Sequence, residues 1–188
     1  LYNVLQAVNW NAIDKGDTET SLIVVNLSNF YRAVLNKGDD DISVEKELKI
    51  VEYYINVEKA IYGDIFKVVY NIDEDIKNCL AIPLILQPLV ENAIEHGIRS
   101  LAEPHGEIAV SAYAEGGTLV FTVSDNGAGI PPQKTDTILT KATSGYGLKN
   151  INERIKLRFG EEYGLRLTSP RSPTVFTITL PLIPLEPQ

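Results

Sequence analysis

The chain has 188 residues, and 44% of them are hydrophobic, which is enough to bury one sizeable core or one domain with a smaller helical piece. Its 17 basic and 25 acidic residues give a net charge of −8, which argues against a nucleic-acid or polybasic membrane-binding surface. A single cysteine, Cys79, excludes an internal disulfide framework and suits a reducing compartment. The longest apolar run, residues 80–86, is too short to cross a bilayer. The chain begins without methionine and in mid-pattern, so we expect a fragment of a longer protein.

The first third of the chain is predicted to be helical. Residues 1–15 contain no glycine or proline, and residues 18–36 carry apolar side chains at helical spacing. Ser43 is a plausible N-cap for a third helix that continues to Gly63. The apolar stripes indicate packing between helices, and they suit pairing with a second copy of the chain equally well.

After Gly63 the pattern changes to alternating strands and two more helices. We expect strands at 65–73, 107–114, 119–125, 163–169 and 174–182, and helices at 84–98 and 148–160. Residues 115–117 read as a hairpin turn, and residues 131–147 as a long loop. The fold class predicted is α+β, with helices against one face of a mixed sheet.

The strand at 119–125 ends in an unusual place for a charge. Leu119, Phe121 and Val123 share one face of the strand, and the next residue on that face is Asp125. Burying a carboxylate without a partner is unfavourable, so Asp125 needs one. Gly127 and Gly129 follow directly, where the backbone can turn tightly or allow a close approach.

Two further segments carry candidate site residues. On the helix at 84–98, Asn92 and His96 are four apart and share a face, and an amide oxygen with an imidazole suits a hard cation with phosphate. Gly145 and Gly147 stand where the long loop enters a helix, which is a natural phosphate site. Taken singly, a solvated helix face and an ordinary turn explain these residues as well. The order of the three segments is much harder to obtain by accident.

Three segments together resemble a known superfamily. VENAIEHGI (90–98), SDNGAGI (124–130) and SGYGLKN (144–150) resemble the N, G1 and G2 boxes of the GHKL superfamily of ATP-binding domains. The resemblance covers residues 82 to 181. It implies a Bergerat-type α/β sandwich, in which helices cover one face of a mixed sheet.

The N-terminal third narrows the resemblance. LSNFYRAVLN (27–36) and ISVEKELKIVEYYINVEKAIYGD (42–64) look like the LytS-like sensor histidine kinases of bacterial two-component systems. This implies a helical dimerisation and phosphoacceptor region at 1–62 and an ATP-binding catalytic domain at 63–188. In that family the acceptor histidine lies in the run His-Phe-Leu-Tyr-Asn, and this chain begins at Leu1-Tyr2-Asn3. We therefore expect the acceptor just upstream of Leu1, and neither His96 nor His105 occupies its position.

The resemblance also implies roles for the nucleotide-binding residues. Asp125 would accept a hydrogen bond from the exocyclic amine of adenine, with Gly127 and Gly129 giving the base and sugar close access. Thr174 corresponds to a threonine near the adenine, although Pro173 stands where that family usually has glycine.

The phosphate side of the site is implied in the same way. Asn92 would hold Mg²⁺, and His96 would lie near the phosphates. Glu91 matches the acidic residue that helps to deprotonate the incoming histidine. Gly145 and Gly147 would shape a lid over the phosphates.

The implied function is transfer of the γ-phosphoryl group of ATP to a histidine, and then to an aspartate of a response regulator. The resemblance further implies a homodimer formed through the N-terminal helices, Mg²⁺ as cofactor, and a cytoplasmic domain of a membrane-anchored parent. No nucleic acid is expected as a partner, and no direct membrane contact from this chain. Two alternatives remain at this point: a nucleotide-binding scaffold that transfers nothing, and an ATP-driven clamp of the chaperone or topoisomerase kind.

Overall fold

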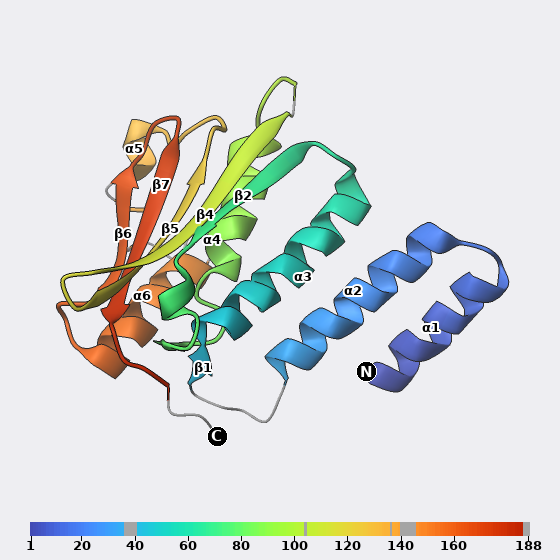
Figure 1. Ribbon diagram of the computed structural model, residues 1–188. Helices are drawn as coiled ribbons and strands as arrows, with labels where there is room; N and C mark the ends of the chain where they lie inside the picture. Colours follow the sequence, from blue (N-terminus) through green and yellow to red (C-terminus); the bar gives the residue numbers. More distant parts are fainter. Residues whose placement is uncertain (36–40, 104, 136, 140–145, 186–188) are drawn as a thin grey trace.

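The computed structural model describes residues 1–35, 41–103, 105–135, 137–139 and 146–185. A five-stranded sheet carries helices on one face, and a helical hairpin lies beyond those helices (Figure 1). This is the predicted α+β architecture.

Three helices form the N-terminal part of the chain, as predicted: α1 (Tyr2–Asp14), α2 (Thr18–Val34) and α3 (Val44–Tyr62). Asp17 caps α2 by accepting a hydrogen bond from the Thr20 N–H, and Ser43 caps α3 in the same way. Helix α3 ends at Gly63, which has a φ of 75°. α1 packs on α2, and α2 packs on α3.

The main sheet has the strand order β2-β4-β5-β7-β6. Its members are β2 (Phe66–Ile72), β4 (Gly106–Glu115), β5 (Thr118–Asp125), β6 (Gly164–Ser169) and β7 (Thr174–Pro181). Strand β2 runs parallel to β4 and the other pairs are antiparallel, so the sheet is mixed. A small second sheet pairs β1 (Ile42–Ser43) with β3 (Leu80–Ala81). Two-residue strands show no periodicity, which is why the sequence did not predict them.

The helix that carries Asn92 begins later than predicted. Its α-helical part, α4, is Gln87–Asn92, and it continues as a π-helical segment, η2 (Ala93–Ile98). Leu84 has a φ of 61°, which is incompatible with a right-handed helix, so helical structure starts only after residue 86. Pro88 then occupies the first turn, where its missing N–H leaves no bond unmade. The described part of the loop predicted at 131–147 includes a short helix, α5 (Pro132–Thr135), and its last two residues already belong to the next helix.

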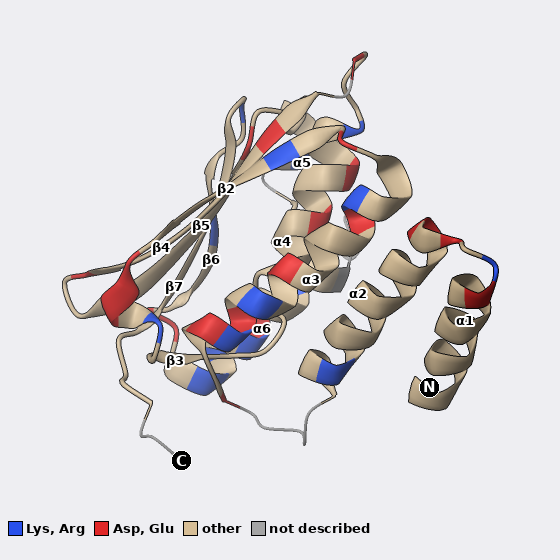
Figure 2. Cartoon of the chain, turned by 45° about the vertical axis from the view of Figure 1, so that its right-hand side comes forward, with Lys and Arg blue, Asp and Glu red and all other residues tan. Residues whose placement is uncertain are grey.

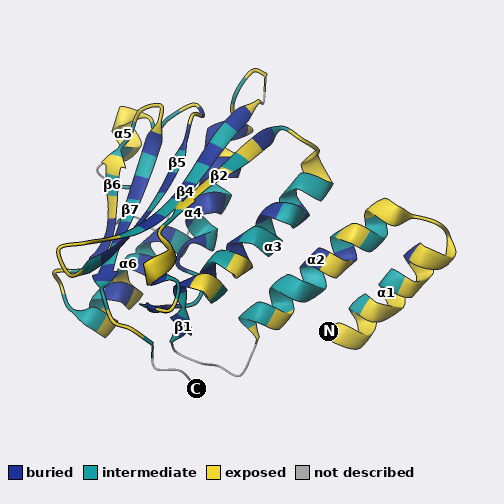
Figure 3. Cartoon of the chain, in the orientation of Figure 1, coloured by how far each residue is buried: buried dark blue, intermediate teal, exposed yellow. Residues whose placement is uncertain are grey.

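One hydrophobic core joins the helices to the sheet (Figure 3). Helix α3 contributes buried side chains to the same cluster as α4, η2 and the strands. The buried members of this cluster include Ile50, Val51 and Ile55 from α3, and Leu89, Ile94, Ile98, Phe121 and Ile178 from the other elements. The predicted domain boundary after residue 62 stays a prediction. Residues on both sides of that boundary contribute to this core.

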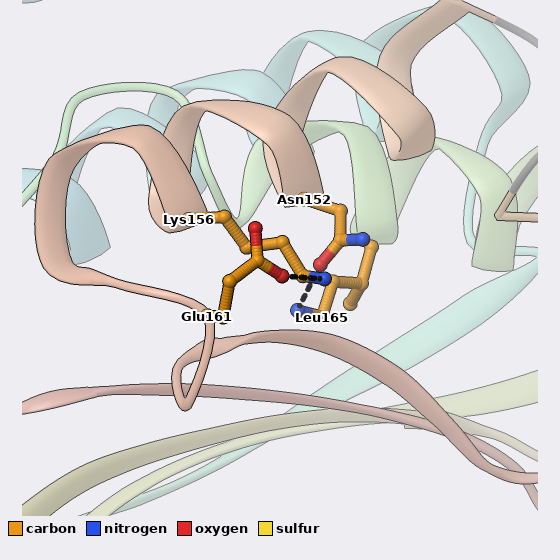
Figure 4. A network of polar contacts seen from close by, with 4 residues as sticks. All are labelled: Asn152, Lys156, Glu161 and Leu165. Carbon is orange, nitrogen blue, oxygen red and sulfur yellow. Dashed lines mark hydrogen bonds and ion pairs between the residues drawn. The ribbon is translucent and has the colours of Figure 1, made fainter.

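Helix α6 (Tyr146–Phe159) is fixed to the sheet by polar contacts at its C-terminal half (Figure 4). The side-chain oxygen of Asn152 accepts a hydrogen bond from the Leu165 N–H at 2.9 Å. Lys156 pairs with Glu161 at 2.6 Å in the turn that leads to β6. Helix α6, which contains Gly147, is therefore held against strand β6.

Candidate functional site

A cavity of about 650 Å³ opens where η2, the end of β5, α5 and the β6–β7 turn meet. Its volume lies within the range of small-molecule sites in proteins. Five of the predicted site residues line it: Asn92, His96, Asp125, Gly129 and Thr174. These residues are up to 82 positions apart in the chain, and the fold brings them to one opening.

Asp125 lies in the wall of this cavity with 6% of its surface exposed. Like Leu119, Phe121 and Val123, it points to the buried face of β5, as the alternation predicts. Its Oδ1 accepts a hydrogen bond from the Gly127 N–H at 2.9 Å. Burial raises the pKa of Asp125, and hydrogen bonds from Gly127 and Thr174 act in the opposite direction. The result is a nearly buried acid that can accept a further N–H donor from a ligand.

Two glycines make this arrangement possible. A Cβ on Gly97 would overlap the carboxylate of Asp125, and a Cβ on Gly127 would overlap the backbone of Gly97. The Ala128 N–H also donates to the Gly97 carbonyl at 3.2 Å. The helix layer and the end of β5 can therefore approach this closely because neither Gly97 nor Gly127 has a side chain. Gly97 was not among the residues predicted for the site; its place directly after His96 was the available signal.

Thr174 is paired with Asp125 in the register of β5 and β7, and it is also buried. This places a hydroxyl beside the carboxylate, despite Pro173 standing before it. Thr174 also lines the cavity, and its role beside the adenine stays a prediction.

Asn92 and His96 both line the cavity, as their spacing predicts. The amide nitrogen of Asn92 donates to the Pro88 carbonyl one turn earlier. Because the nitrogen is engaged, the oxygen is the end of the amide that remains for a cation or its water. The donor set therefore fits a magnesium ion that is shared with phosphate oxygens.

Glu91 and Gly147 lie outside the described lining of the cavity. Glu91 is half-buried beside Gln87, whose amide donates to it at 3.4 Å. Burial and the neighbouring Glu95 raise the pKa of Glu91, whereas His96 lowers it. A raised pKa moves a carboxylate toward the range of a general base at neutral pH. Gly147 packs against Pro88 at the start of α4, and Gly145 lies outside the described residues.

Two cationic residues that line the cavity were missed at the level of sequence. Lys134 is on α5, and Arg171 is in the turn between β6 and β7. The Ile130 N–H donates to the Pro170 carbonyl at 2.8 Å, which holds that turn against the loop after β5. Single charges in loops follow no periodic pattern, so only the folded chain assigns them to the cavity.

The fold and the cavity define a class of nucleotide-binding domain, and the family comparison agrees. The chain belongs to the family of histidine kinase-, DNA gyrase B- and HSP90-like ATPases, whose model matches residues 80–184. A histidine kinase model matches residues 1–66. ATP is thus the nucleotide of this class of domain, and the GHKL resemblance is confirmed.

Named relatives of the chain are sensor histidine kinases and a sensor protein. The chain is 35% identical to the sensor histidine kinase YesM of Bacillus subtilis over 96% of its own length. It is also 35% identical to the sensor histidine kinase YpdA of Escherichia coli and to the sensor protein LytS of Staphylococcus saprophyticus. These two matches cover 100% and 98% of this chain. The chain spans only 31%, 33% and 32% of these three relatives.

Solved structures of histidine kinases share the fold. The catalytic domain of ThkA matches with a TM-score of 0.57 at 17% identity, covering 77% of this chain and 96% of that domain. The histidine kinase domain of a blue-light-activated kinase from Erythrobacter litoralis matches with a TM-score of 0.58 at 20% identity, covering 96% of this chain and 83% of that one. Within the described ranges, no helix is both long and apolar enough to traverse a membrane.

Replacing Gly127 by alanine tests the close packing under the cavity. The new methyl group would overlap the Gly97 backbone and push η2 away from Asp125. We expect the affinity for ATP, measured by isothermal titration calorimetry, to fall roughly tenfold or more, since displacements near 1 Å have large effects at such sites. Thr122→Ala, on the other face of β5, is the matched control and should bind like the unaltered chain. Equal affinities for Gly127→Ala and the unaltered chain would contradict this account.

Proposed function

We propose that this chain is the helical and ATP-binding part of a sensor histidine kinase, which transfers the γ-phosphoryl group of Mg-ATP to a histidine. The observation that carries the proposal is Asp125, a nearly buried acid in a cavity that Asn92 and His96 also line. Family membership and the sensor kinases among the relatives support it.

In this proposal the adenine lies against Asp125 and Thr174. The carboxylate accepts the exocyclic N–H of the base, Gly129 in the cavity wall leaves room for the base and sugar, and Gly127 lets η2 approach Asp125. A buried acceptor selects a ring that presents a donor there, because a ring without one would leave the carboxylate unpaired.

The phosphates lie toward Asn92 and His96. Bound Mg²⁺ would neutralise charge on the phosphate oxygens. Asn92 supplies its amide oxygen to the ion, and Glu91 takes the proton from the attacking histidine nitrogen. A nitrogen–phosphorus bond forms as the bond from the γ-phosphorus to the bridging oxygen breaks, and ADP leaves. The phosphoryl group then passes to an aspartate of a response regulator. ThkA, which shares this fold, has been solved in complex with the response regulator TrrA.

Removing either polar anchor should weaken nucleotide binding. We expect Asn92→Ala and Asp125→Ala each to reduce the affinity for Mg-ATP by an order of magnitude or more, about 1.5–3 kcal/mol, because each removes a metal or charge-assisted contact. Calorimetric titration measures the effect. Unchanged affinities in both variants would refute the site.

A phosphorylation assay tests the activity itself. A chain extended upstream through the acceptor histidine, incubated with γ-labelled ATP and Mg²⁺, should yield acid-labile, base-stable phosphate on the protein. Glu91→Gln in that longer chain should bind ATP normally but phosphorylate more slowly. ATP binding without any phosphoprotein would favour the scaffold alternative, and hydrolysis without phosphoprotein would favour the clamp.

We further propose a homodimer formed through α1 and α2. These helices carry few charges between their ends, as Figure 2 shows, and several large apolar side chains are exposed on them: Val4, Val8, Trp10, Ile13, Leu22 and Val25. Apolar surface of this extent marks an interaction site.

The parent protein would be anchored in the bacterial membrane, with this part in the cytoplasm. Fractionation of cells that express the complete protein tests this localisation.

Charge introduced into that surface should break the dimer. Trp10 is 72% exposed on α1, and Trp10→Glu would place a carboxylate in the proposed interface at a large desolvation cost. We expect the dimer population in sedimentation velocity of the extended chain to be lost. Leu157→Glu is the control, since Leu157 is an exposed apolar residue of α6. A dimer that survives Trp10→Glu would show that the interface lies elsewhere.

A further inference from the structure

Helix α3 carries a second buried acid, Glu47, which lies outside the described lining of the cavity. Its side chain is 0% exposed, and among the described residues only Glu47 and Asp125 are buried acids. The carboxylate accepts three backbone hydrogen bonds, each 2.8 Å long. Leu84 N–H donates to Oε2, and Ile85 and Leu86 N–H donate to Oε1. A buried carboxylate is tolerated only with such partners.

The three donors are consecutive amides, and they come directly before α4. Leu84 is the only non-glycine residue with a positive φ in the described part of the chain. Because that conformation is strained for leucine, residues 84–86 need outside contacts to hold it. The carboxylate of Glu47 supplies them, across 37 to 39 positions of sequence.

The same segment is also held from helix α6. The guanidinium of Arg154 donates to the Pro83 carbonyl at 2.9 Å. Burial raises the pKa of Glu47 to about 7, while the three backbone N–H groups and the charge of Arg154 lower it. Residues 83–86 are thus bonded on one side to α3 and on the other to α6.

This segment sets the position of the polar side chains over the cavity. Gln87, the first residue of α4, follows Leu86 directly, and Asn92 is the last residue of the same helix. At about 1.5 Å of rise per residue, Asn92 is within roughly 9 Å of the anchored amides along a rigid helix. A shift of residues 84–86 would carry Asn92 with it. Asp125 belongs to strand β5, and the hydrogen bonds of Glu47 within the described residues go to residues 84–86 and not to that strand.

We propose that Glu47 is a positioning residue for the phosphate and metal side of the nucleotide site, acting through residues 84–86 on the helix that carries Asn92. This inference rests on the proposed function, because it assigns Asn92 to the metal side. It also gives α3 a direct connection to the ATP site: a movement of α3 along its axis would move the start of α4.

Two substitutions grade the effect. Glu47→Ala removes both acceptor oxygens and with them all three hydrogen bonds, while Glu47→Gln keeps one acceptor oxygen for Ile85 and Leu86 and turns an amide NH₂ toward the Leu84 N–H. The control is Glu45→Gln, an exposed acid in the first turn of the same helix. All variants are made in the 188-residue chain, and their thermal unfolding is recorded first.

Two ligands then separate the two sides of the site. Mg-ATP is titrated by calorimetry, and adenosine, which has no phosphates, by NMR. We expect Mg-ATP affinity to fall roughly tenfold in Glu47→Ala and less in Glu47→Gln, with adenosine affinity within about twofold of the unaltered chain. The loss should shrink when Mg²⁺ is removed with EDTA. Glu45→Gln should match the unaltered chain throughout.

Several outcomes would overturn the inference. Unchanged Mg-ATP affinity in folded Glu47 variants would remove the positioning role. An equal loss for Mg-ATP and adenosine, or failure of both variants to fold, would make Glu47 a residue of the fold and not of the site. If the unaltered chain itself bound no Mg-ATP, the proposed function would fail first, and this result is distinct from the others.

Discussion

This site depends on one constraint: the carboxylate of Asp125 has to stay nearly buried in the wall of the cavity. Asp125 continues a row of large apolar side chains on β5, so its charge faces the helix layer and not the solvent. The fold meets the resulting desolvation with the Gly127 N–H, the Thr174 hydroxyl and open space on the ligand side. A side chain on Gly97 would overlap the carboxylate itself, and one on Gly127 would overlap the Gly97 backbone, so the acid and these two glycines act as one unit.

The helix above this acid is positioned from its beginning and from its end. At its beginning, residues 83–86 are bonded to Glu47 of α3 and to Arg154 of α6. At its end, the ring of Tyr62 on α3 lies 4.3 Å from the guanidinium of Arg99, which follows η2. Helix α6 is in turn bonded to β6 through Asn152, and to Glu161 in the turn before β6 through Lys156 (Figure 4). Since polar contacts of this kind depend on direction, they define the register of α4 and η2 more sharply than the surrounding apolar core does.

The N-terminal helices contrast with this rigidly held part. Their apolar side chains are not all used within the chain: α1 buries Ala12, while Val4, Trp10 and Ile13 remain exposed. Helix α3 differs, because its apolar side chains are buried in the core beside the sheet. The helical third of the chain therefore contains two kinds of helix. One kind keeps large apolar side chains exposed, and the other belongs physically to the nucleotide-binding layer.

Much of this could be read from local pattern. Helical and strand periodicities located nearly every long element, and the alternation on β5 predicted the direction of Asp125, because side-chain direction follows from backbone geometry alone. The three boxes indicated the family because each of them is a short continuous segment that can be recognised without the fold. Tertiary structure alone decided that Gly97 lies against Asp125, that Lys134 and Arg171 join the cavity, and that Glu47 bonds to residues 84–86. Such contacts join residues far apart in the chain, and they depend on strand order and helix placement, which no local period encodes.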